Sequence, residues 1–362
     1  MHLPKITLRV VLQTAMMLAI GAIGGLLAYW VRWPMPWMFG ALLAAGVTVR
    51  LVQPVSLSDY DFPMDFRTFF VALIGVMIGT QVTPDLLSLA GELPITLSAL
   101  VLFVVAAHAG NMAIFHRIGG YDRSTAFFSG TPGGLMESIF MGEAAGADTR
   151  ILTVQQFLRI ILVITLLPVG LSLWIGHPVG SAAGLTIGGD KPPVTPVALV
   201  MIAITAVLGL WVGRRIRLPA AQLTGPLLLA AAATVTGVLD LHLPFWLIAT
   251  AQLVIGVSLG MRFKGVDAGL LRRSLWLAAL SVSYMLLLGM TFAIVLERLT
   301  GIAFLHLFIS FAPGGVAEMS VVALSLAANP ALVSLHHVVR ILITVVEMPL
   351  AAKVMGLRPP RF

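Results

Sequence analysis

The chain has 362 residues, of which 59% are hydrophobic and only 10% are charged. An average soluble domain has about 45–50% apolar and about 25% charged residues, so this composition excludes an ordinary soluble domain and predicts a protein embedded in lipid. The formal charge of +7 comes from basic residues scattered singly or in pairs between apolar segments, which favours membrane topology over nucleic-acid binding. Cysteine is absent, which excludes disulfides, thiolate metal sites and cysteine nucleophiles.

Apolar runs of about 20 residues, the length that crosses about 30 Å of hydrocarbon as a helix, recur along the chain. No small-residue cleavage site follows the first run, Leu8 to Trp30, so we expect it to stay in the mature protein. In the first half we expect helices over 8–31, 37–52, 67–84, 93–116 and 150–174, with a Gly-rich segment over 124–147. In the second half we expect helices over 195–213, 219–239, 243–261, 273–297 and 334–356, with a Gly-rich segment over 303–329.

The two halves repeat one pattern of glycine, proline and charged residues. Three motifs occur in both halves: Gly-x7-Arg-x-Pro-x5-Gly from Gly24 (with Pro34) and Gly209 (with Pro219), Gly-x3-Gly from Gly75 and Gly256, and Phe-x-Ser-x-x-Pro-Gly-Gly-x-x-Glu from Phe127 and Phe308. An arginine and a proline follow the last motif at the same distance, as Arg159 and Pro168 and as Arg340 and Pro349. The chain is therefore predicted to be a duplication: residues 1–175 are the first membrane repeat, 176–195 a linker and 196–362 the second repeat.

The distribution of basic residues predicts that the two repeats lie upside down relative to each other. Lysine and arginine favour short cytoplasmic loops. The loop over 81–92 has Asp85 and Glu92 and no basic residue, whereas the matching loop of the second repeat has Arg262, Lys264, Arg272 and Arg273. If each Gly-rich segment is re-entrant, each repeat has five crossings, and an odd number inverts the next copy. We expect an all-α protein with ten crossings, two re-entrant helical hairpins and both termini cytoplasmic, in a bacterial inner membrane.

Inverted repeats of this kind recur in secondary transporters, whose substrates bind near the membrane midplane at broken helices. In the Gly-rich segments, proline ends one half-helix, and paired glycines free backbone amides at the start of the next. Such a helix N-terminus attracts anions. The alternative is that the glycines only permit tight packing. The candidate binding residues in these turns are Pro132, Gly133 and Gly134, and Pro313, Gly314 and Gly315.

One arginine lies inside the last apolar helix of each repeat. Arg159 and Arg340 stand some nine and six residues into these helices, where a charge is costly and usually functional. Gln155 shares a helix face with Arg159, and His336 shares one with Arg340. These side chains could bind a carboxylate or a similar anion. The alternative is a structural pairing of the arginines with the motif glutamates or with half-helix carbonyls.

Three carboxylates are candidates for coupling to a proton or a cation. Glu137, Glu318 and Glu347 could change protonation in a dry site, and the alternative is that they are fixed counter-ions. Adjacent residues on a helix point about 100° apart, and His336 and His337 have no evident partner cluster. We therefore expect ordinary hydrogen-bonded histidines and no metal site.

Other polar groups give no sign of catalysis. His108 and Asn111 are expected to hydrogen-bond to other helices, and the alternative is that they line a transport path. The sequence has no Walker A motif, Rossmann fingerprint, zincin motif or catalytic-triad spacing. We therefore predict neither an enzyme nor an ATP-driven pump, and expect no cofactor.

The repeated Pro-Gly-Gly-x-x-Glu motif, followed by Gln155-Gln156-x-x-Arg159 and by His336-His337-x-x-Arg340, resembles the AbrB-type duplicated membrane protein family of bacteria. The resemblance covers about residues 15–355. Family members are named after a proposed regulator of another gene's expression, and some carry the label of ammonia monooxygenase. That chemistry needs clustered ligands for copper or iron, which eight scattered histidines do not provide. The halves also differ, because Leu166 occupies the place of Glu347, so the two halves of a site are chemically unequal.

These observations predict a secondary transporter or permease for a small solute, with an organic anion as the favoured class and a midplane site at the two Pro-Gly-Gly hairpins. The alternative is a membrane-embedded ligand sensor or regulator of gene expression that does not transport. A membrane metalloenzyme is a third hypothesis. The expected partners are the lipid bilayer, a small-molecule substrate and a coupling proton or cation, without nucleic acid; a homo-oligomer stays an open alternative.

Overall fold

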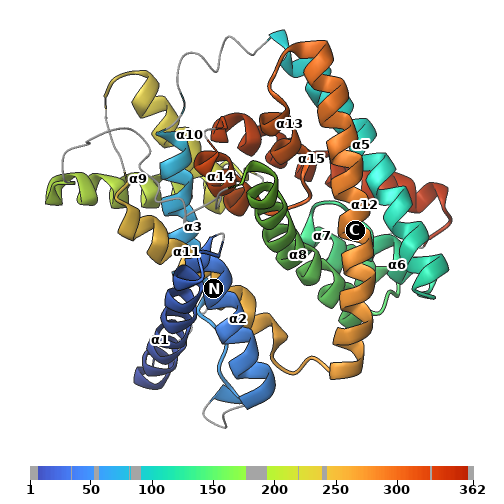
Figure 1. Cartoon of the computed structure of the whole chain (residues 1–362), viewed down its shortest axis with the longest axis horizontal. Helices are drawn as coiled ribbons and strands as arrows, with labels where there is room; N and C mark the ends of the chain where they lie inside the picture. Colours follow the sequence, from blue (N-terminus) through green and yellow to red (C-terminus); the bar gives the residue numbers. More distant parts are fainter. Residues whose placement is uncertain are drawn as a thin grey trace. The chain divides into compact units, whose positions relative to one another are not determined.

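The computed structural model in Figure 1 describes residues 7–33, 35–52, 57–80, 82, 91–176, 194–218, 220–238, 243–326 and 328–357. Within these ranges the regular structure is helical and contains no β-strand. Seven of the described helices are long and apolar enough to cross a membrane: α1 (Leu8–Trp30), α5 with η4 (Leu93–Ile118), α8 (Thr149–Ile175), α9 (Pro196–Arg215), α11 with η6 (Phe245–Phe263), α12 (Ala268–Thr300) and α15 (Pro330–Val354). This all-helical chain is consistent with the predicted polytopic membrane protein.

The other helices are shorter. Two of the described ones are apolar: α2 (Pro36–Val47), which continues as the π-helix η1 (Thr48–Val52), and α10 (Ala221–Val235). The helix α3 (Met64–Gly79) is of similar length. Each Gly-rich segment forms two short helices, α6 (Arg123–Ser129) with α7 (Leu135–Ala144), and α13 (Phe304–Phe311) with α14 (Val316–Ser325). The helices therefore fall close to the predicted ranges, although α12 begins five residues earlier than predicted.

Side-chain caps explain where the helices α6, α12 and α15 begin. Asp122 accepts a hydrogen bond from the Thr125 amide at 2.9 Å at the start of α6. Asp267 accepts one from the Leu270 amide at 2.9 Å, so α12 begins at residue 268. Asn329 accepts two at 3.1 Å at the start of α15. Such caps satisfy amides that have no partner within the helix.

The helices divide into two compact units that each draw on both halves of the sequence. Unit 1 comprises Met1–Thr80 and Pro168–Val266, and unit 2 comprises Gln81–Leu167 and Asp267–Phe362. Unit 1 thus contains α1 to α3 and α9 to α11, whereas unit 2 contains α5 to α7, most of α8, and α12 to α15. Each predicted repeat contributes to both units. Residues 177–193 of the predicted linker, and Pro34, Pro219 and Asp85, lie outside the described residues.

Glycines bring the helices of unit 1 into backbone contact. A Cβ added to any of four glycines would lie less than 3.0 Å from a carbonyl oxygen of another helix: Gly75 and Gly79 on α3 face α10, and Gly256 and Gly260 on α11 face α2. Real Cβ atoms essentially never approach so closely, so only glycine fits. The predicted role of the two Gly-x3-Gly pairs, close approach of helix backbones, is confirmed.

The first repeated motif also forms matching structures in unit 1. Gly24 on α1 faces the Gly40 backbone on α2, and Gly225 on α10 faces the Gly209 backbone on α9. The arginine of the motif has a positive φ in both places, 54° at Arg32 and 56° at Arg217. Such angles are uncommon for residues other than glycine. The same local backbone therefore occurs at both places in the sequence.

Candidate functional site

The two Pro-Gly-Gly turns each interrupt a helix in unit 2. In the first, α6 ends at Ser129 and α7 begins at Leu135. Gly134 has a φ of 60°, a left-handed conformation that favours glycine. In the second, α13 ends at Phe311 and α14 begins at Val316, and both of these helices pack against α15 (Figure 1). Residues 131–134 and 312–315 therefore interrupt the helical hydrogen-bond pattern, which leaves carbonyl groups available to side chains.

Both predicted arginines bind carbonyl groups of these turns. Arg159 on α8 is 7% exposed and donates from Nη1 to the Thr131 carbonyl. Arg340 on α15 is 2% exposed and donates from Nη1 to the Ala312 carbonyl at 2.5 Å and from Nη2 to the Gly314 carbonyl at 2.7 Å. These carbonyls follow the first half-helix, where a cation is favoured by the helix dipole. The bonds match the alternative role in which the arginines hold half-helix carbonyls.

The guanidinium groups also keep hydrogen-bond donors that the protein does not use. The Nε atoms of Arg159 and Arg340 are buried and have no hydrogen-bond partner in the described part of the chain. Both guanidinium groups are buried cations. Buried charges are costly without a countercharge. The turns therefore combine positive charge with free donors, which suits an anion.

Gln156, rather than the predicted Gln155, contacts the first turn. Its Nε2 donates to the Phe128 carbonyl at 3.0 Å and to Thr131 Oγ1 at 2.8 Å, whereas Gln155 Nε2 donates to Tyr121 Oη at 2.9 Å. The Oε1 atoms of both glutamines are buried without a partner among the described residues. Gln156 was missed by the sequence reasoning, although its spacing of three residues from Arg159 already places the two side chains on one helix face.

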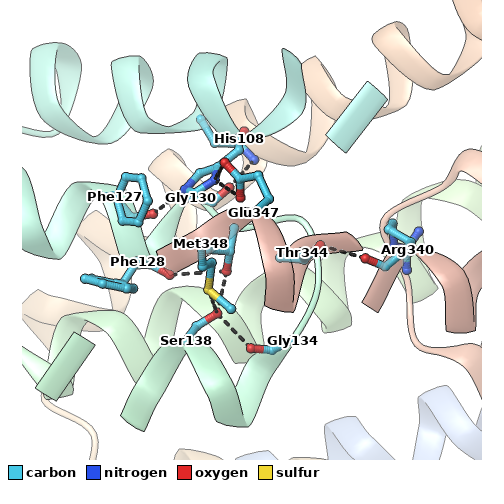
Figure 2. A network of polar contacts seen from close by, with 12 residues as sticks. His108, Phe127, Phe128, Gly130, Gly134, Ser138, Arg340, Thr344, Glu347 and Met348 are labelled. Atoms are coloured by element: carbon cyan, nitrogen blue, oxygen red, sulfur yellow. Dashed lines mark hydrogen bonds and ion pairs between the residues drawn. The ribbon is translucent and has the colours of Figure 1, made fainter. Parts of the chain in front are cut away.

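Two serine and threonine hydroxyls brace the same turn, and neither was singled out from the sequence. Thr131 Oγ1 lies 2.6 Å from Ser138 Oγ, and Ser138 Oγ donates to the Gly134 carbonyl at 2.7 Å (Figure 2). These bonds connect the beginning of the turn to the first full turn of α7. Their only sequence signal is the position of the two hydroxyls on either side of the Pro-Gly-Gly motif.

His336 and His337 are fully buried on α15 and make ordinary local hydrogen bonds, as predicted. Nδ1 of His336 lies 2.9 Å from the Leu332 carbonyl, and Nδ1 of His337 lies 2.8 Å from the Val333 carbonyl. A carbonyl only accepts, so Nδ1 of each ring carries a hydrogen. Both Nε2 atoms are buried without a partner in the described ranges. No group of three His, Asp or Glu side chains there could hold a metal ion.

The motif glutamates fold back onto their own turns. Glu318 is 7% exposed, and its carboxylate occupies the space that a Cβ of Gly315 would need. Glu137 is exposed, and its Oε2 would lie 3.5 Å from a Cβ on Gly134. Each glutamate is the third residue of its half-helix, where the free amides favour a carboxylate. At the second turn the Gly-x-x-Glu spacing therefore has a local structural reason, because Gly315 leaves room for the Glu318 carboxylate.

Glu347 lies apart from the motif glutamates and pairs with His108 (Figure 2). Nδ1 of His108 lies 2.8 Å and 3.0 Å from the two carboxylate oxygens, and its Nε2 lies 2.9 Å from the Phe127 carbonyl. The side chains are 3% and 16% exposed. Asn111, one turn further along α5, donates to the Gly130 carbonyl at 3.0 Å and accepts from Ser281 at 2.8 Å. Both α5 side chains thus bond to other helices, as expected.

The candidate residues form a packed polar cluster within unit 2. An apolar groove of about 580 Å³ lies between α5 and α12 of the same unit, but no candidate residue lines it. Its lining is aliphatic and aromatic apart from Ser98, so it lacks the groups that bind a charged solute. The chemistry of the unit therefore resides at the two turns and at the His108–Glu347 pair.

Long apolar helices, two helices broken at Pro-Gly-Gly, and buried arginines on the turn carbonyls define a helical membrane protein of the polytopic class. Residues 37–356 match the family model described as "Transition state regulatory protein AbrB", and the chain belongs to this family. It is 25% identical over 348 residues to "Uncharacterized protein YhjN" of Bacillus subtilis (strain 168), covering 92% of this chain and 90% of the relative. It is 26% identical over 294 residues to "Putative regulator AbrB" of Escherichia coli (strain K12), covering 80% and 82%.

Proposed function

We propose that the chain is a secondary transporter or permease for a small organic anion that binds at the two Pro-Gly-Gly turns of unit 2. The observation that carries the proposal is the pair of buried arginines on the turn carbonyls, each with an unused Nε donor. An arginine presents donors in a planar fork that fits a carboxylate. No catalytic reaction, metal or cofactor is part of the proposal.

Four further buried side chains on α8 and α15 carry polar atoms that suit a polar ligand. The Oε1 atoms of Gln155 and Gln156 and the Nε2 atoms of His336 and His337 are buried without partners in the described structure. A buried polar atom without a partner costs about 1–3 kcal/mol, so a ligand that supplies hydrogen bonds there gains affinity. An organic anion with hydroxyl groups would satisfy both the unused donors and the unused acceptors.

An inverted pair of repeats is part of the proposal, with five crossings and one re-entrant hairpin in each repeat and both termini in the cytoplasm of a bacterium. Matching glycine contacts and matching positive φ angles in unit 1 support the duplication. The opposite loop charges support the inversion. Broken helices in both repeats are where transporters of this architecture bind their substrates.

Proteoliposomes test transport directly. Purified protein in liposomes is given radiolabelled acetate, lactate, succinate or citrate, with and without an imposed pH gradient. We expect uptake of at least one anion above empty liposomes, and at least a tenfold loss in Arg159→Gln and in Arg340→Gln. Arg298→Gln is the matched control, because Arg298 is exposed on α12. Uptake that survives in both buried-arginine variants, or that is lost equally in the control, contradicts the site.

A second candidate is a membrane-embedded sensor that binds an anion without moving it. It is favoured by the name of the Escherichia coli relative, which describes a regulator. The same anions would then raise the thermal unfolding temperature of the purified protein, but would not enter the liposomes. Stabilisation that is lost in Arg340→Gln, together with no flux, would favour the sensor over the transporter.

A further inference from the structure

His108, which is buried, and Glu347, which is partly buried, are ionisable partners that the anion site does not use. They come from α5 and α15 of unit 2, 239 residues apart in the sequence. We propose that the two side chains together bind one exchangeable proton, and that this proton is the one coupled to anion movement. The second half of the proposal rests on the proposed transport function, whereas the proton site itself does not.

The hydrogen bonds fix the number of protons on the pair. Nε2 of His108 faces the Phe127 carbonyl at 2.9 Å, and a carbonyl has no proton to give, so Nε2 carries a hydrogen. Nδ1 then faces the Glu347 carboxyl group at 2.8 Å and 3.0 Å. This contact needs one proton, either on Nδ1 beside a carboxylate or on the carboxyl group beside a bare nitrogen. The two forms differ only in where that proton resides.

Loss of this proton would break the contact. A bare Nδ1 and a carboxylate would face each other with their lone pairs at hydrogen-bond distance, in a nearly dry site where such repulsion is strong. The released proton passes to water, and Glu347 keeps the negative charge. The side chains are then expected to separate, so the proton controls whether α5 and α15 are joined at this point.

The pair is connected to the first Pro-Gly-Gly turn through two short paths. Phe127, whose carbonyl accepts the hydrogen bond from His108 Nε2, lies on α6 just before the turn. Met348 follows Glu347, and its sulfur lies 3.6 Å from Ser138 Oγ, whose single hydroxyl hydrogen is donated to the Gly134 carbonyl at 2.7 Å (Figure 2). Separation of His108 from Glu347 would therefore release α6 and α15 on both sides of the turn.

Several other ionisable groups lie on the surrounding helices, and three of them have partners elsewhere. Arg123 donates to the Met355 carbonyl at 3.4 Å and Tyr284 to the Ala106 carbonyl at 2.9 Å, and Arg340 binds the second turn. The helices packed on α5 and α15 also carry His116 and Arg117 on η4, Arg272, Arg273, Glu297 and Arg298 on α12, His306 on α13, Glu318 on α14, and His336, His337 and Lys353 on α15. Glu347 is the carboxylate in contact with His108.

The sequence predicts one such site per chain. The Pro-Gly-Gly motifs are 181 residues apart, and at this offset Gly289 corresponds to His108 and Leu166 to Glu347. Neither of these residues can bind a proton. A transport cycle coupled through this site would therefore move one proton, although the anion site draws on both repeats.

Nitrogen-15 NMR of histidine-labelled protein in lipid nanodiscs tests the proton site without a substrate. We expect His108 to keep a hydrogen on Nε2 and to lose a single proton as the pH rises, and Glu347→Gln to abolish that step. Glu143→Gln, on the exposed face of α7, is the control. Two results would overturn the site: a His108 signal with the hydrogen on Nδ1 and a bare Nε2, or an unchanged loss of the proton in Glu347→Gln. If the variant does not fold, the wild-type spectrum alone still shows which nitrogen of His108 carries the hydrogen.

Proteoliposomes test the coupling separately. For an anion that the wild-type protein takes up, we expect an inward pH gradient to accelerate uptake at least fivefold, and the Glu347→Gln variant to lose this acceleration while it still equilibrates the anion. Acceleration that persists in Glu347→Gln contradicts the coupling. Absence of uptake of all four probe anions contradicts the proposed function, and the NMR result then stands by itself.

Discussion

Arg159 and Arg340 bind their turns with different numbers of hydrogen bonds. Arg340 uses two nitrogens to bridge two carbonyls, whereas Arg159 is bonded through Nη1 to the Thr131 carbonyl. A lysine ammonium acts as a point charge and cannot reproduce a planar fork. We therefore expect Arg340→Lys to lower the free energy of unfolding by about 1–3 kcal/mol more than Arg159→Lys, because a buried carbonyl loses its partner.

Thermal or denaturant unfolding of the two variants in the same detergent measures this difference. Arg298→Lys provides the baseline, because Arg298 is exposed and a surface substitution is expected to change stability by less than about 0.5 kcal/mol. Equal losses in the two buried variants would show that the second carbonyl of the turn adds no stability.

Gly315 and Glu318 are predicted to be coupled through shared space. An alanine at 315 would place its Cβ where the Glu318 carboxylate lies, so Gly315→Ala is expected to cost about 1–3 kcal/mol. In Glu318→Ala that space is empty, so the same Gly315→Ala change should then cost much less. A double-mutant cycle of unfolding free energies checks this expectation, and additive effects would mean that the carboxylate moves away freely.

At the scale of single residues, the sequence predicts the turns and their arginines but not their partners. The Pro-Gly-Gly motif and an isolated arginine in an apolar helix are local signals, and both were found. Gln155 was preferred to Gln156 because i, i+4 spacing was used, although i, i+3 spacing serves equally well. The contact of His108 with Glu347 joins distant positions, and neither local sequence carries a sign of it.

At the scale of helices, the glycine contacts of unit 1 make a matched comparison available. Gly256 and Gly170 both lie inside helices, but a Cβ on Gly256 would meet the α2 backbone, whereas a Cβ on Gly170 would meet nothing within 4 Å. Alanine favours a helix by up to about 1 kcal/mol over glycine. Gly170→Ala should therefore be neutral or stabilising, and Gly256→Ala should lower stability by about 1–3 kcal/mol through overpacking.

The unfolding temperatures of these two variants in nanodiscs decide the question. Opposite signs of the change are expected, and a stabilising Gly256→Ala would mean that α2 and α11 can move apart without cost. The comparison is internally controlled, because both substitutions have the same effect on helix propensity.

The helices themselves were largely predictable because apolar length and flanking polar residues determine where a membrane helix starts and stops. Errors occur at helix ends: α3 ends at Gly79, five residues before its predicted end, and α12 begins before its predicted start. The predicted start of α12 was Arg273. The helix begins five residues earlier, at residue 268, directly after its capping residue Asp267, so Arg272 and Arg273 belong to its first turns. A rule that looks for apolar runs passes over such charged first turns, whereas a rule for capping residues would have found this start.

At the scale of the whole molecule, the division into two units could not be read from the repeats. A duplicated sequence favours two structural halves, one for each repeat. The contacts instead join α3 to α10 and α2 to α11 in unit 1, and they join α5 to α15 in unit 2. Each unit therefore combines both repeats. These pairings depend on which glycine faces which carbonyl, and that information resides in the packing of distant segments.

The interleaved units lead to a test with a divided chain. Fragments 1–185 and 186–362 separate the two repeats between α8 and α9, and each fragment then lacks half of unit 1 and half of unit 2. We expect neither fragment to purify alone as a stable, monodisperse protein, whereas the two expressed together should copurify in detergent. Gly256→Ala in the second fragment should weaken copurification, because Gly256 packs on α2 of the first, and Gly170→Ala should not. Two fragments that fold independently would show that each repeat, rather than each interleaved unit, is the structural domain.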